Sequence, residues 1–232
     1  MGPDGLELFV EVVHDLRSPL TSILFLAETL QRGRSGDVTN LQQRQLGLIY
    51  SAALGLSGLV SNALELAGGT DELLDSEPSP LSLSELLESV AAIALPMAEE
   101  KGLQITVSPA QPDSRLGQPV ALSRAVLNLT TNALKFTDTG SVEIRATPRG
   151  ATRLEFSVRD TGPGINPDAL TYLYQPFRRA RGRDGYCFSG TGLGLAISRK
   201  LVAAMGAELK LETGSWGTLF YFELDLPVLT PR

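Results

Sequence analysis

Apolar residues in the first third of the chain recur every three or four positions, the spacing of one face of a helix. They fill the a and d positions of four heptads: Leu6, Phe9, Val13, Leu16, Leu20, Ile23, Ala27 and Leu30. The polar stretch 32–39 interrupts the pattern, which then resumes at Ile49, Ala52, Leu56, Leu59, Ala63 and Leu66 and stops at Gly68 and Gly69. We expect residues 1–69 to form an antiparallel helical hairpin.

A single hairpin of this kind exposes more apolar surface than its two helices can cover. Full burial of a large apolar side chain is favourable by about 1.5 to 3 kcal/mol, so the remaining surface favours association. We predict a homodimer in which two hairpins form an antiparallel four-helix bundle. The alternative is that the hairpin packs against the rest of its own chain.

The pattern changes after residue 69. Residues 70–80 are acidic and contain two prolines, so we predict a linker, followed by a domain at 81–232. The periodicity predicts helices at 81–101, 119–136 and 192–205, and strands at 103–108, 141–147, 153–160, 208–213 and 217–226. This alternation predicts an α/β sandwich with helices on one face of a sheet, so the whole chain falls in the α+β class.

Composition and charge exclude several classes of protein. The net charge of −6 over 232 residues disfavours nucleic acid as a partner. The single cysteine, Cys187, and the lack of a Cys/His cluster suit a reducing compartment. No run approaches the roughly 18 apolar residues of a membrane span, and no signal sequence is present. We expect a soluble cytoplasmic core, with any membrane attachment supplied by an N-terminal input region that precedes this sequence.

His14 is the only histidine, and it occupies a b position of the heptad, so it should face water. Asp15 is adjacent, and Ser18 lies on the same helical face. A carboxylate near an imidazole can hold one ring nitrogen as N–H and leave the other as a nucleophile. Pro19 permits a bend one turn later. A surface histidine is commonly only solvated, so these residues alone leave its role open.

Three polar residues lie within two turns of one predicted helix. Asn128, Asn132 and Lys135 are spaced four and three apart, so they can face one site. Amide oxygens suit Mg²⁺, and an ammonium group suits phosphate. For this segment alone, a solvated polar face is the simpler interpretation.

Two glycine-containing segments follow. Residues 160–165, Asp-Thr-Gly-Pro-Gly-Ile, end a predicted strand with a carboxylate that can accept a hydrogen bond from an adenine amino group. Residues 190–197 open a predicted helix, whose free N–H groups favour anions such as phosphate. Neither segment has the spacing of a dinucleotide-binding fingerprint or of a P-loop.

Residues 14–23, His-Asp-Leu-Arg-Ser-Pro-Leu-Thr-Ser-Ile, resemble the H box of sensor histidine kinases. Four further segments resemble the motifs of the kinase ATP-binding domain, which is of the GHKL type. They are the N box at 128–137, the first glycine box at 160–165, the F box at 173–177 and the second glycine box at 190–197. Residues 214–220 resemble the last hairpin of that domain. These five ordered motifs of the ATP-binding domain make a chance agreement negligible, and with the H box the resemblance covers nearly the whole chain.

The resemblance implies a protein-histidine kinase of a two-component system. It would autophosphorylate on His14 with ATP and then transfer the phosphoryl group to an aspartate of a response regulator. Asp15 would assist proton removal. Ser18 stands where the family often has Thr or Asn, which leaves phosphatase activity open. The alternatives are an ATP-sensing dimeric scaffold and a phosphatase-dominated regulator of a phosphorylated receiver. The input signal, the cognate regulator, and cis or trans phosphorylation do not follow from the sequence.

The resemblance also implies an ATP and Mg²⁺ site. Asn128 and Asn132 would serve the metal, Lys135 the phosphates and Asp160 the adenine. The complete set of implied nucleotide-binding residues is Asn128, Asn132, Lys135, Phe136, Asp160, Gly162, Gly164, Phe177, Gly190, Thr191, Gly192, Leu193 and Gly194. Residues 178–189 would form a lid over ATP, and Tyr174 stands where the F box often has Phe. Related ATPases have Glu in place of Asn128, so an amide there favours transfer over hydrolysis.

Overall fold

The structure of the chain is a computed structural model. It describes residues 77–175 and 193–229 continuously, and in the N-terminal third it describes 16, 18–27, 29–30, 33–36, 38–39, 41–43, 45–47, 49, 53 and 56. The chain divides into two compact units, residues 1–69 and residues 70–232, and each is described by itself. No helix in the described parts is long and apolar enough to cross a membrane.

In the first unit, the described residues form two helical stretches. The segment between them caps the end of the first helix and the start of the second. The first stretch ends at Gly33, which has a left-handed backbone (φ 67°). The N–H of Gly33 donates to Leu30 O (3.0 Å) and that of Arg34 to Thr29 O (3.1 Å), the two bonds of a Schellman turn. The second stretch begins with a capping box, in which Thr39 and Gln42 each accept the other's backbone N–H. The interruption predicted at 32–39 is confirmed.

The two rows of the predicted heptad seam differ in exposure. The a-position residues Leu20 and Ala27 are only 4% and 3% exposed. The d-position residues Leu16, Ile23 and Leu30 are 36–43% exposed. Among the described residues of the first helix, the d positions are therefore the part of the seam that a single chain leaves open to solvent.

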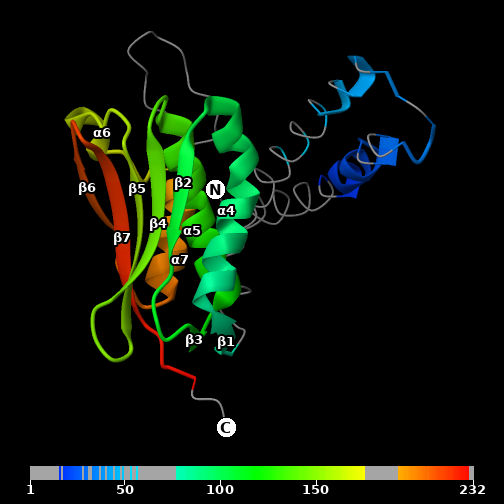
Figure 1. The fold of residues 1–232 in the computed structure, drawn as a ribbon. Coiled ribbons are helices and arrows are strands. Elements are labelled where there is room, and N and C mark those ends of the chain that lie inside the picture. The colour runs from blue at the N-terminus through cyan, green and yellow to red at the C-terminus, as the bar shows by residue number, and fades with distance from the viewer. Residues whose placement is uncertain are drawn as a thin grey trace, which may run out of the picture. The chain divides into compact units, whose positions relative to one another are not determined.

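The second unit is built on a five-stranded sheet with the strand order β2-β4-β5-β7-β6 (Figure 1). The strands are β2 (Gln104–Ser108), β4 (Ser141–Pro148), β5 (Arg153–Asp160), β6 (Lys210–Gly214) and β7 (Gly217–Asp225). β2 pairs with β4 in parallel, and the other pairs are antiparallel. Alternate residues of the central strands are buried, and the rings of Phe156 and Phe222 stack at 5.6 Å between neighbouring strands.

Three helices cover one face of this sheet: α4 (Leu83–Lys101), α5 (Pro119–Phe136) and α7 (Gly194–Ala204) (Figure 1). The predicted sandwich with helices on one face is confirmed, and α5 and β5 have the predicted bounds. A short helix, α6 (Pro167–Leu170), lies in the segment that we expected to be loop.

A second, two-stranded sheet was not predicted. It pairs β1 (Ser79–Ser82) antiparallel with β3 (Ser114–Gly117), so the last two residues of the predicted linker segment form a strand. Helix α4 begins at Leu83 and not at residue 81, because Ser82 is its N-cap and accepts the N–H of Glu85 at 3.1 Å. Ser82 also donates to Asp113 at 2.6 Å, which fixes the cap against the loop before β3.

Arg115 in β3 is 1% exposed and joins three segments through backbone carbonyls. It donates to Pro112 O at 2.9 Å, to Leu226 O at 3.1 Å and to Ala151 O at 3.3 Å. Strand β3 lies directly before the N-terminal end of α5. Arg115 therefore stabilises the end of the domain at which α5 begins.

Candidate nucleotide site

Two side-chain amide nitrogens of α5 are buried without a partner among the described residues. The Nδ2 atoms of Asn128 and Asn132 are both buried and make no hydrogen bond within the described parts of the chain. A buried polar group without a partner costs about 1–3 kcal/mol, and such groups are rare in native proteins. The pair is thus suited to a polar group that the described residues do not provide.

The first residue of α7 lies against one of these amides. A Cβ atom added to Gly194 would be 3.2 Å from Asn132 Nδ2. The N-cap of α7, Leu193, is buried and gives no side-chain hydrogen bond to the helix. Because the first N–H groups of a helix lack intrahelical acceptors and carry partial positive charge, this end favours an anion. The structure thus brings together three of the residues that the motifs assign to a nucleotide site: Asn132, Leu193 and Gly194.

Asp160 ends β5 and is 6% exposed. Its Oδ1 atom accepts the backbone N–H of Gly162 at 2.9 Å and that of Thr218 at 3.1 Å. Burial raises the pKa of Asp160, and these two hydrogen bonds oppose the rise. A carboxylate has about four acceptor positions, so Asp160 can also accept a further donor such as an amino group.

Gly162 connects this carboxylate to the end of α5. A Cβ atom at Gly162 would lie 3.0 Å from both Asp160 Oδ1 and Phe136 O, and 3.2 Å from Thr137 Oγ1. These distances are tighter than ordinary contacts of a Cβ atom, so glycine favours the close approach of this turn to α5. Gly164 has φ 74°, and a Cβ there would be 2.2 Å from Gly214 O, so it too must be glycine.

Lys135 and Phe136 form the last turn of α5. The Lys135 ammonium lies 5.1 Å from the centre of the Phe136 ring, a cation–π distance, and Phe136 is 38% exposed. Tyr174, which departs from the F-box pattern, places its ring 4.7 Å from the guanidinium of Arg199 on α7. Tyrosine at this position therefore still provides an aromatic ring, which here contacts Arg199.

Comparisons with known proteins match both units. Residues 6–72 match the His Kinase A (phospho-acceptor) domain, and residues 117–228 match the family of histidine kinase-, DNA gyrase B- and HSP90-like ATPases. The chain belongs to the sensor histidine kinases. Its predicted family membership is confirmed.

Curated histidine kinases align with nearly all of this chain. The signal transduction histidine-protein kinase BarA of Escherichia coli (strain K12) is 31% identical over 228 residues, which cover 95% of this chain and 24% of BarA. The sensory/regulatory protein RpfC of Xanthomonas campestris pv. campestris is 32% identical over 226 residues, which cover 94% of this chain and 31% of RpfC. This histidine kinase sequence therefore spans about a quarter to a third of the length of these relatives.

Solved structures of histidine kinases have the same fold. The crystal structure of full-length ShkA in complex with AMPPNP matches with a TM-score of 0.70 and 28% identity, over 100% of this chain and 47% of that one. The catalytic domain of the histidine kinase ThkA shares the fold with a TM-score of 0.55 and 24% identity. The predicted α+β fold of a histidine kinase core is confirmed.

Several predicted site residues lie outside the described residues of this histidine kinase: His14, Asp15, Phe177, Gly190, Thr191 and Gly192. Ser18 is described, and it is helical and exposed. Its carbonyl accepts the hydroxyl of Ser22 at 3.1 Å. An exposed Ser18 is compatible with the predicted helical face on which it accompanies His14.

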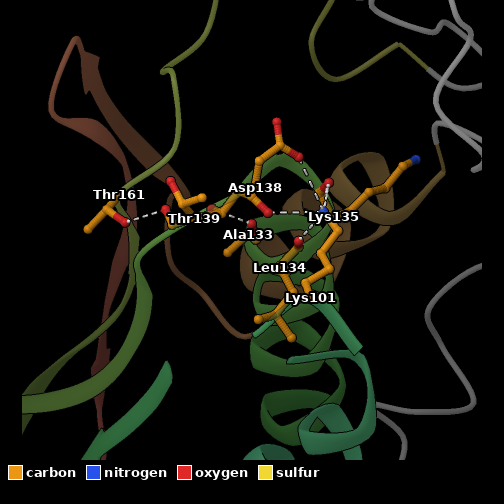
Figure 2. A network of polar contacts seen from close by, with 8 residues as sticks. Lys101, Ala133, Leu134, Lys135, Asp138, Thr139 and Thr161 are labelled. Carbon is orange, nitrogen blue, oxygen red and sulfur yellow. Dashed lines mark hydrogen bonds and ion pairs between the residues drawn. The ribbon is translucent and has the colours of Figure 1, made fainter. Parts of the chain in front are cut away.

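Two residues that contact the segments of the candidate site were not identified from the sequence. Thr218 holds Asp160 through its backbone N–H, which leaves no signal in a pattern of side chains. Lys101, the last residue of α4, donates to carbonyls at the end of α5 (Figure 2). A lysine in the last turn of a helix is common, so nothing in the sequence sets Lys101 apart.

Proposed function

We propose that this chain transfers the γ-phosphoryl group of ATP to His14, and from there to an aspartate of a response regulator. The observation that carries this proposal is the pair of buried amide nitrogens, Asn128 Nδ2 and Asn132 Nδ2, that lack a partner among the described residues; the second of them lies against the first residue of α7. They occur in a chain whose other unit belongs to a phospho-acceptor domain and contains its only histidine.

The described residues fit an adenine nucleotide with Mg²⁺. Asp160 can accept the adenine amino group, while the start of α7 and Lys135 supply positive charge for the phosphates. An amide offers N–H donors to phosphate oxygens and, turned over, an oxygen to a hard cation. Asn128 and Asn132 would hold Mg²⁺, which neutralises charge on the phosphates when bound.

The proposed transfer step needs a nucleophile more than it needs a base. A lone pair of the His14 imidazole attacks the γ-phosphorus, the bond from that phosphorus to the ADP oxygen breaks, and ADP leaves. Asp15 takes the proton released from the ring. The amide of Asn128 cannot act as a base toward water, which favours transfer over hydrolysis. A carboxylate of the receiver then attacks the phosphorus, and the bond to the imidazole breaks.

We also propose that the kinase is a homodimer with a four-helix bundle. The exposed d row of the first helix, at Leu16, Ile23 and Leu30, supports a second copy at this seam. These three side chains would gain burial on association, whereas Leu20 and Ala27, the described residues of the a row, are already buried within one chain.

Incubation with labelled ATP and Mg²⁺ tests the phosphotransfer. We expect an acid-labile, alkali-stable phosphoprotein, and we expect His14→Gln to lose the label while it binds ATP with unchanged affinity. Label retained in His14→Gln would contradict the proposal, because the chain has no second histidine. ATP binding without labelling of the unchanged chain would instead indicate an ATP-sensing scaffold. Dephosphorylation of a receiver without ATP turnover would indicate a phosphatase.

A further inference from the structure

The ammonium group of Lys101 lies at the C-terminal end of a neighbouring helix. Its Nζ atom donates to Leu134 O at 2.9 Å, to Lys135 O at 2.8 Å and to Thr137 O at 2.9 Å (Figure 2). Lys101 is the last residue of α4, and its three acceptors lie at the end of α5. The side chain therefore ties the two helix ends together.

These contacts satisfy carbonyls that a helix cannot satisfy by itself. The last four carbonyls of an α-helix have no intrahelical donors, and the helix dipole places partial negative charge there. A lysine ammonium has three donors and no acceptor, which matches three converging carbonyls. The nearby carboxylate of Asp138 is 3.8 Å from Lys101 Nζ and 84% exposed, so it adds little.

The carbonyl contacts lead directly to the nucleotide residues. Thr137, whose carbonyl Lys101 binds, also donates its hydroxyl to Ala133 O at 2.8 Å within a buried turn. A Cβ at Gly162 would be 3.2 Å from that Thr137 hydroxyl, and Gly162 N donates to Asp160. The chain of contacts thus runs from Lys101 through Thr137 and Gly162 to Asp160.

The same turn is held from its other side. Thr161, between Asp160 and Gly162, accepts the N–H of Ser141 at 3.0 Å. Its hydroxyl also donates to Thr139 O at 3.4 Å (Figure 2). The loop from Thr137 to Ser141 is therefore fixed at both ends, by Lys101 and by Thr161. Thr161 belongs to the predicted glycine segment 160–165. Lys101 belongs to α4, a helix that contains no predicted site residue.

We propose that Lys101 is a positioning residue for adenine-nucleotide binding. This inference rests on the proposed function, and it assigns to α4 a part in the ATP site. Lys101 does not touch the nucleotide; it sets where the end of α5 stands against the Asp160 turn. Because that turn binds the part of ATP that does not react, loss of Lys101 weakens ground-state and transition-state binding alike, which raises KM more than it lowers kcat.

The test compares three variants of the whole chain. Lys101→Met keeps the apolar stem without the ammonium, and Lys101→Arg keeps the charge and the donors. Arg115→Met is the matched control, because Arg115 also binds three carbonyls but lies at the other end of α5. The measurements are the Kd for Mg-ATP, KM and kcat for labelling of His14, and the unfolding midpoint of each variant.

We expect Lys101→Met to raise Kd and KM about tenfold, with kcat within about twofold, because the substitution weakens binding and leaves the reacting groups in place. Lys101→Arg should restore Kd to within about threefold. Arg115→Met should lower the unfolding midpoint at least as much without changing Kd. An unchanged Kd in Lys101→Met, or an equal rise in Arg115→Met, would overturn the inference, as would Lys101→Arg behaving like Lys101→Met.

A further substitution at the same position, Lys101→Gln, provides the test if Lys101→Met does not fold. Lys101→Gln keeps a neutral donor, and we expect its Kd to rise in the same direction; an unchanged Kd in a folded Lys101→Gln overturns the inference. Failure of the proposed function is a different result. It would appear as no labelling of the unchanged chain, whereas failure of this inference leaves labelling intact with the KM for ATP unaltered by Lys101→Met.

Discussion

Asn132 on α5 and Gly194 on α7 are so close that a Cβ at Gly194 would lie 3.2 Å from the Asn132 amide nitrogen. Gly194→Ala would therefore displace an amide of the proposed nucleotide site by a few tenths of an ångström. Alanine favours a helix over glycine by up to about 1 kcal/mol, so the fold should lose little stability. We expect a roughly tenfold weaker Kd for Mg-ATP, measured by titration calorimetry.

Gly150→Ala is the control for that substitution. Gly150 lies in the turn between β4 and β5, and its nearest neighbour would be Arg153 Cβ at an ordinary 3.7 Å. This variant should bind Mg-ATP like the unchanged chain. Equal affinity of both glycine variants would show that contact with Gly194 does not fix Asn132 for binding.

Asp160→Asn should change which base the site prefers. A carboxylate accepts from the amino group of adenine, whereas an amide can also donate to the carbonyl oxygen of guanine. We expect the affinity for ATP to fall at least about tenfold and the ratio of ATP to GTP affinity to fall further. Competition binding with the two nucleotides measures this ratio. An unchanged ratio would remove Asp160 from base recognition.

The same substitution has a predicted pH signature in the absence of nucleotide. Because burial raises the pKa of Asp160 above its ordinary 3.8, the folded state binds this proton more tightly than the unfolded state does. Its contribution to stability is complete below 3.8 and is lost as the pH rises through the folded-state pKa. Asp160→Asn should therefore gain stability relative to the unchanged chain as the pH rises from 3.8 through the folded-state pKa of Asp160, as urea unfolding at several pH values would show.

Asn132→Ala should lose ligand binding without losing apo stability. The substitution removes a buried donor that has no partner, which offsets the small cavity that it creates. We expect an unfolding free energy within about 1 kcal/mol of the unchanged chain. With Mg-ATP at 100 times its Kd, the unchanged chain should gain about 2.7 kcal/mol, and the variant nothing. A variant that is still stabilised by Mg-ATP would contradict this assignment.

Ile23→Lys tests the proposed dimer seam. Ile23 is a d-position residue that is 42% exposed in the single chain, so a lysine there is tolerated by the monomer and is costly only at an apolar interface. We expect light scattering to show a monomer. Ser22→Lys, one residue away and off the seam, should remain dimeric. A dimeric Ile23→Lys would place the interface elsewhere.

The elements with strong periodicity could be predicted from sequence, and short paired strands could not. Helix α5 buries a continuous apolar stripe, and its bounds agree with the prediction. Strands β1 and β3 have only four residues each and consist largely of serine, proline, arginine and glycine. Apolar and polar residue types hardly alternate along them. Their pairing depends on Asp113 and Arg115, whose partners are distant in sequence. Such contacts cannot be predicted from a local pattern.

The candidate site also contains residues that could be predicted from the sequence and residues that could not. The residues that we propose to face the nucleotide lie in recognisable motifs, so Asn132, Asp160 and Gly194 could be found in the sequence. Residues that act on backbone groups do not, because any residue offers the same N–H or carbonyl. Lys101 and its acceptors are 33 to 36 residues apart, and only the folded chain brings them together.

The buried amide nitrogens of Asn128 and Asn132, which lack partners among the described residues, lower the stability of the fold, but we propose that the same amides are needed for nucleotide binding. In a laboratory selection for heat resistance alone, substitutions at these two positions should be enriched early. A selection that requires labelling of the histidine should retain both asparagines. Sorting one mutant library by both criteria would therefore outline the nucleotide site as the set of positions on which the two selections disagree.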